Sequence, residues 1–132
     1  MVAVVTNKAF TETALLMTGG TATAWATMAV GTGSQNENAT DLSLVTEVTA
    51  NGLARVACAS KGVTDSSVTG DTCFFQHTFT DTATDTYAVK ECGIFNSTAG
   101  GDMLCYGTFA TAVPMESLDT LKITWSVQVK SG

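Results

Sequence analysis

A two-residue alternation of apolar and polar side chains near the C-terminus is the strongest constraint on the fold. From Leu121 to Val129 every second residue is apolar, and the residues between them are Lys, Thr, Ser and Gln. Successive side chains of a β-strand point to opposite faces of its sheet, so this pattern predicts a strand with one buried face.

Segments of β character recur along the rest of the chain, with turns between them. They span residues 21–33, 53–63, 72–80, 87–96 and 103–109. Thr, which is β-branched and favours strands, is abundant, and strands do not alternate with helices as in a parallel sheet. We expect an all-β protein of roughly six to eight strands, arranged as an antiparallel β-sandwich or a jelly-roll-like barrel with room for one short helix.

Two stretches of the N-terminal half have helical features. Residues 9–18 form either a short helix capped near Thr11 or an extended link. Residues 41–48 fit a single helical turn that Thr40 or Asp41 would cap.

The length of 132 residues suits one domain. Residues 1–8, MVAVVTNK, are either a free apolar arm that pairs with a neighbouring chain or an ordinary first strand. We therefore divide the chain into an N-terminal arm, residues 1–8, and a single β domain, residues 9–132.

The charge of the chain argues against nucleic-acid binding. The net charge is −6, and the six basic residues are scattered rather than gathered in a patch that could neutralise phosphates. No apolar run reaches the length of a membrane-spanning helix, and the N-terminus lacks the pattern of a secretion signal. We expect that the protein does not associate with membranes and that it assembles in a cytoplasm.

Catalytic and cofactor-binding patterns are missing from the sequence. His77 is the only histidine and lies in an aromatic strand, where a buried core histidine is the simpler interpretation. The cysteines form no CxxC pair, which disfavours zinc; buried free thiols are the favoured interpretation, and disulfides stay open. These four residues are Cys58, Cys73, Cys92 and Cys105. We expect neither an enzyme nor a cofactor; glycan and calcium binding are undecided.

Two side chains stand out from their surroundings. Glu91 lies in an otherwise apolar strand, and it is either a buried carboxylate that ties down a loop or a neighbouring subunit, or an exposed residue beside Lys90. Tyr87, Val89 and Phe95 lie an even number of residues from Glu91, on the same face of a regular strand, which favours burial. Trp25 falls on the more polar face of its strand, where it either anchors a partner or packs under a loop.

The order of several motifs resembles a broad group of small tailed-phage virion proteins, which includes capsid decoration (cement) proteins and tail-fibre or collar-like domains. The motifs are Ala29-Val30-Gly31-Thr32-Gly33, Leu44-Val45-Thr46-Glu47-Val48, Leu53-Ala54-Arg55, Glu91-Cys92-Gly93-Ile94-Phe95-Asn96, Gly100-Gly101-Asp102-Met103-Leu104 and Leu121-Lys122-Ile123-Thr124-Trp125. The resemblance covers residues 10–129. It implies a sandwich-like virion component, present in repeated copies and assembled in the host cytoplasm, without a catalytic residue.

The resemblance also implies structural roles for four residues: Gly31 and Gly33 would serve a turn, and Glu91 and Gly93 would fix the strand near it. Because the chain has no fibrous repeat, the leading hypothesis is a capsid decoration protein that binds the major capsid protein as a trimer or dimer. Expected contacts are Val2, Val4, Val5, Trp25 and the 31–41 loop.

Two alternatives remain. The first is a tail or fibre-attachment component that binds a tail protein of the same particle. The second is a carbohydrate-binding module, which would need an exposed aromatic platform built from Trp25, Tyr87 and Tyr106.

Overall fold

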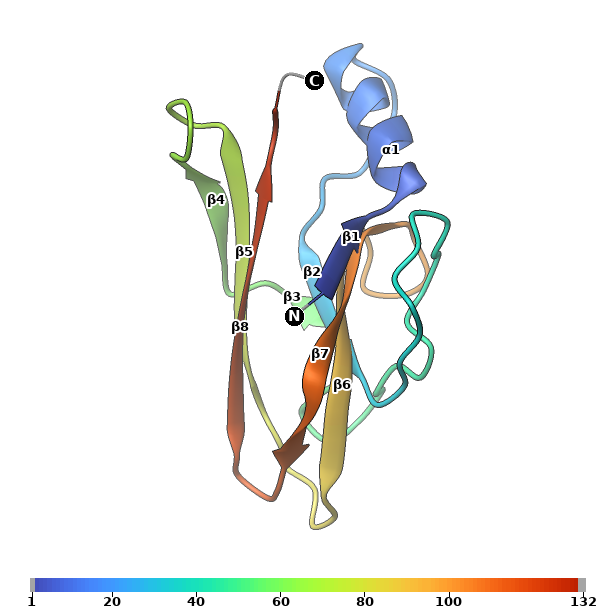
Figure 1. Ribbon diagram of the computed structural model, residues 1–132, viewed down its shortest axis with the longest axis vertical. Coiled ribbons are helices and arrows are strands. Elements are labelled where there is room, and N and C mark those ends of the chain that lie inside the picture. The colour runs from blue at the N-terminus through green and yellow to red at the C-terminus, as the bar shows by residue number, and fades with distance from the viewer. Residues whose placement is uncertain (1, 131–132) are drawn as a thin grey trace.

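Strand pairing arranges residues 2–130, the part of the chain that the computed structural model describes, into two antiparallel sheets that face each other (Figure 1). The elements are β1 (Val2–Val5), α1 (Asn7–Met17), β2 (Thr27–Gly31), β3 (Val56–Ala57), β4 (Ser60–Thr64), β5 (Thr72–Thr80), β6 (Tyr87–Phe95), β7 (Met103–Met115) and β8 (Thr120–Gln128). The expected β-sandwich with one short helix is confirmed. Met1 and residues 131–132 lie outside the described residues.

The two sheets differ in width. The larger sheet has the strand order β1-β7-β6-β2-β3, and the smaller has the order β4-β5-β8. Residues 58–59 carry the chain from the β3 edge of the larger sheet to the β4 edge of the smaller one. At the opposite side, β1 and β8 are the edge strands, and residues 116–119 join β8 to β7 of the larger sheet at one end of the sandwich.

The main core lies between the sheets. Its buried members include Met28, Val30, Leu53, Phe75, Phe79, Val89, Cys92, Ile94, Cys105, Ile123 and Trp125. In β8, Ile123 and Trp125 are buried while the polar residues between them are exposed, as the alternation predicts. The indole nitrogen of Trp125 donates to the sulfur of Cys92 at 3.0 Å, which links the two sheets through the core.

A second core covers the outer face of the larger sheet. It contains Ala29, Leu44, Phe95, Met103 and Tyr106. The long segment between β2 and β3 lies over this face, at the right of the view (Figure 1). Every residue of β2 is buried as a result, because both faces of this strand are covered.

Both helical predictions need correction. The helix begins at Asn7 and is capped by Thr6 rather than Thr11, because the Thr6 hydroxyl accepts the Ala9 amide at 3.3 Å and also donates to the Met103 carbonyl. Residues 41–48 form no helical turn; Glu47 makes an isolated β-bridge with Gly31 instead. Within residues 2–130, no helix has the length and apolar character needed to span a membrane.

Candidate association surface

The N-terminal residues form an edge strand of their own chain. Strand β1 pairs with β7 in a register that places Val2 opposite Thr108 and Val5 opposite Cys105. Val5 packs against the main core and Val4 against the outer one, whereas Val2 is exposed. The strand leads directly into α1, so the boundary expected at residue 8 falls inside the helix.

Helix α1 buries little of its surface against the rest of the described residues. Ala9 is its only buried residue, and α1 projects past the strand ends at one end of the sandwich (Figure 1). Phe10 and Met17 are 66% and 83% exposed, and Leu16 is exposed as well. Phe10, Ala14 and Met17 follow the i, i+4, i+7 spacing of one helix face. Leu16 lies on the neighbouring face of the helix, and we name Phe10, Ala14, Leu16 and Met17 together the α1 stripe.

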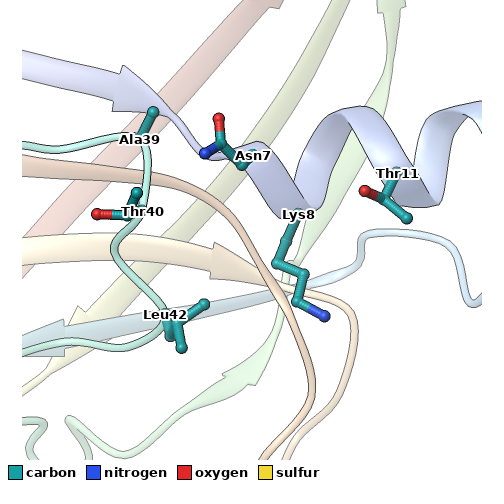
Figure 2. Close-up of a pocket in the computed structure, with 6 residues that line it drawn as sticks. All are labelled: Asn7, Lys8, Thr11, Ala39, Thr40 and Leu42. Carbon is teal, nitrogen blue, oxygen red and sulfur yellow. The ribbon is translucent and has the colours of Figure 1, made fainter.

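The first turn of α1 is anchored to the loop beside it. The Asn7 amide donates to the Ala39 carbonyl at 2.7 Å, and the Lys8 ammonium lies 3.5 Å from the Asp102 carboxylate. Figure 2 shows the loop at residues 39–42 running past the start of the helix. A cleft of about 340 Å³ lies between the loop and the helix. The helix is therefore fixed at its first turn, while the α1 stripe extends away from this anchor.

Trp25 does not serve as an exposed anchor. It is partly buried against the main core, and its indole N–H is enclosed without a hydrogen-bond partner. Tyr106 is fully buried, and Tyr87 packs against the main core while its hydroxyl accepts from the Asn51 amide at 2.6 Å. The three aromatic residues therefore do not form the platform that a carbohydrate-binding module would need.

Glu91 is fully buried and ties the segment between β2 and β3 to the larger sheet. One carboxylate oxygen accepts the Thr46 amide at 2.8 Å; the other accepts the Val45 amide at 3.0 Å and the Tyr106 hydroxyl at 2.8 Å. Burial raises the pKa of Tyr106, and its hydrogen bond to Glu91 raises it further. The buried negative charge is thus stabilised by three donors.

The glycines near Glu91 provide space rather than an unusual backbone conformation. A Cβ at Gly31 would overlap the Glu91 carboxylate and come within 2.5 Å of the Thr46 carbonyl, and one at Gly33 would lie 2.7 Å from Val45. At Gly93 it would lie 3.1 Å from the Cys105 carbonyl. None of the three has positive φ, and Gly31 is the last residue of β2.

Arg55 makes a second set of contacts that fixes the segment between β2 and β3, and the sequence analysis did not identify it. Its guanidinium pairs with both oxygens of Glu47, at 2.9 and 2.6 Å, and lies 3.6 Å above the centre of the Phe95 ring. It also donates to the carbonyls of Ser97 and Gly100. The only signal in the sequence was that the chain's single arginine lies eight residues after Glu47.

His77 has no catalytic setting. It is partly buried, lies edge-on to Phe79 with ring centres 4.7 Å apart, and its pKa is lowered by burial. Among residues 2–130, no three His, Cys, Asp or Glu side chains are grouped so that they could hold a metal ion. The structure is therefore a β-sandwich whose helix α1 leaves apolar side chains exposed.

Comparison with known proteins agrees with a structural role. A family model described as podophage GP4 fiber I protein gp80 matches residues 5–128, and no curated protein matches. The expected resemblance to tailed-phage virion proteins is confirmed. A fibre family supports the tail or fibre alternative, not the capsid decoration protein of the leading hypothesis. Because the match spans nearly the whole chain, the protein belongs to this family of phage fibre proteins, which are structural parts of the virion rather than enzymes.

Proposed function

We propose that the protein is a structural link of the tail fibre and that it docks onto another tail protein of the virion through the α1 stripe. The observation that carries this proposal is the exposure of α1: an eleven-residue helix buries one side chain and leaves Phe10, Leu16 and Met17 open to solvent. Contiguous apolar surface of this kind marks interaction sites on soluble proteins.

The α1 stripe has enough apolar surface to hold a partner. Burying one large apolar side chain contributes about 1.5–3 kcal/mol, so Phe10, Leu16 and Met17 together offer roughly 5–9 kcal/mol before the costs of association. The anchored first turn holds these side chains in place before binding, which reduces the entropy lost on docking. Several copies on one particle would strengthen attachment further.

The test is incorporation into phage particles. A double variant, Phe10→Ser with Met17→Ser, should keep the thermal midpoint of the wild type, because neither side chain is buried. We expect it to be depleted from purified virions, as measured by quantitative mass spectrometry. Immunogold labelling of wild-type particles should mark the tail.

The matched control changes two equally exposed apolar residues on another part of the surface. Val63 and Val68 are 67% and 68% exposed, in β4 and in the turn that follows it. The double variant Val63→Ser with Val68→Ser should be incorporated normally. Normal incorporation of the α1 variant would remove the docking role, and gold label spread over the head would contradict the tail location.

A further inference from the structure

We propose that the open side of the sandwich binds a second copy of this chain, by antiparallel pairing of β8 with β8 of that copy. This surface is separate from the α1 stripe and is not required by the docking proposed above. The larger sheet has five strands and the smaller three, and β1 and β8 are their edge strands on the side away from the β3–β4 connection.

The side where β8 lies is hollowed and apolar. A groove of about 230 Å³ lies between β1 and β8. Its lining is apolar except for Ser126 and Gln128, and consists of Ala3, Val4, Val5, Cys105, Trp125, Ser126, Val127 and Gln128. On the other side of the sandwich, residues 58–59 connect the edge strands β3 and β4. The edge strands β1 and β8 therefore lie next to one partly apolar groove.

An edge strand presents backbone N–H and C=O groups that another strand can pair with. Strand β8 pairs only with β5, and its nine residues form the longest edge of the sandwich. The opposite edge of the smaller sheet, β4, has five residues with a glycine at its centre. Strand β8 is therefore the edge best suited to pairing.

The sequence of β8 is complementary to itself. Pairing centred on Thr124, the midpoint of the strand, places Ile123 opposite the second copy's Trp125 on the core-facing side. Leu121 likewise meets Val127. On the outer face, Lys122 meets Ser126, so no lysine faces another lysine. A two-fold interface needs this kind of self-complementarity, and like charges directly opposite each other would oppose it.

The area of such an interface is sufficient for a dimer. A nine-residue strand is about 30 Å long, and two sheets about 10 Å apart with their outer side chains are about 20 Å thick, so each copy would cover about 600 Å². The total of about 1,200 Å² is at the lower limit of stable interfaces. It would also cover the groove side chains of both copies.

A cross-linking experiment tests the register. In Thr124→Cys, the two introduced thiols would face each other across the two-fold axis, at the Cα separation that a disulfide requires. Thr78→Cys is the matched control, because Thr78 is an exposed threonine at the centre of the smaller sheet, on β5. We expect Thr124→Cys to form a covalent dimer about tenfold faster than Thr78→Cys.

Light scattering after size exclusion provides the second measurement. The wild type should show a concentration-dependent species of twice the 13.6 kDa chain mass. Thr124→Lys, which places two lysines opposite each other, should raise the dimer Kd about fivefold, equivalent to about 1 kcal/mol. A monomer at high concentration, a trimer, or equal cross-linking at positions 124 and 78 would overturn the proposal. If Thr124→Lys fails to fold, the cross-linking result decides.

Discussion

Replacing Glu91 by alanine tests whether one buried carboxylate holds the segment over the outer face of the larger sheet. The change removes three hydrogen bonds to a charged acceptor and leaves three donors behind: the amides of Val45 and Thr46 and the hydroxyl of Tyr106. A hydrogen bond to a charged group contributes about 1.5–3 kcal/mol, so simple addition would give roughly 5–9 kcal/mol.

The expected loss is smaller than that sum. Val45 and Thr46 are exposed residues, so their amides can bind water once the segment shifts. Tyr106 is fully buried, so its hydroxyl is left without a partner in the core. We expect a loss of about 3 kcal/mol in the free energy of unfolding, which would lower the Tm by about 10 °C for a domain of this size.

Two further variants separate charge from shape. Glu91→Gln keeps the volume but presents an amide group to a donor, and we expect it to lose about half as much, roughly 1.5 kcal/mol. Glu116→Ala is the control, because Glu116 is exposed, and it should stay within about 0.5 kcal/mol of the wild type.

Urea unfolding followed by tryptophan fluorescence gives the free energies, and amide hydrogen exchange reports directly on the segment. In Glu91→Ala the amides at positions 45 and 46 should exchange faster than in the wild type, while core strands such as β6 keep most of their protection. An unfolding free energy within about 1 kcal/mol of the wild type, or unchanged exchange at both amides, would refute this account of Glu91.

Three other predictions concern the same fold. Gly31→Ala should destabilise by about 2–3 kcal/mol in chemical denaturation, since its Cβ overlaps groups that hold the loop; a neutral effect would show that the loop adapts. Arg55→Lys should cost about 1–3 kcal/mol, because Lys cannot pair with both oxygens of Glu47 and also reach the nearby carbonyls; wild-type stability would contradict this. Burial raises the pKa of Cys92 to about 12 and that of Cys105 well above its usual range. Stability should therefore be complete below about pH 8.5 and fall by about 1.4 kcal/mol per thiol per pH unit above it; a flat profile to pH 10 would be inconsistent with buried neutral thiols.

The strands that could be predicted best are those with one face in the core. In β8 the buried and exposed residues alternate as the sequence does, which made this strand easy to recognise. In β2, which lies within the predicted segment 21–33, every residue is buried because both faces of the strand are covered. The prediction of a helical turn at residues 41–48 failed because this segment takes its shape from Glu91 and from a bridge to Gly31, contacts that local spacing does not contain.

Glu91 shows that spacing along one strand can give the wrong face of the sheet for a side chain. Its spacing from Val89 suggested that the two share a face, but the pairing of β6 with β7 is irregular between these residues. Val89 and Cys92 both belong to the core between the sheets, three positions apart, whereas Glu91 contacts the covering segment on the other face. An irregularity in strand pairing is a property of two strands together, so neither strand alone reveals it.

The hypothesis of a capsid decoration protein was wrong because it took the lack of a fibrous repeat as evidence that the protein lies on the head rather than in a fibre. A globular domain can be part of a fibre if its surface provides the contacts, and the apolar residues of α1 were overlooked as a candidate site. In sequence they look like ordinary core residues, since a helix beside a β-sandwich normally buries such a face. Only the structure shows that the core is complete without Phe10 and Met17. An apolar helix that its own fold does not need is therefore better explained by a partner than by stability, which is the physical reason for placing the docking surface on α1.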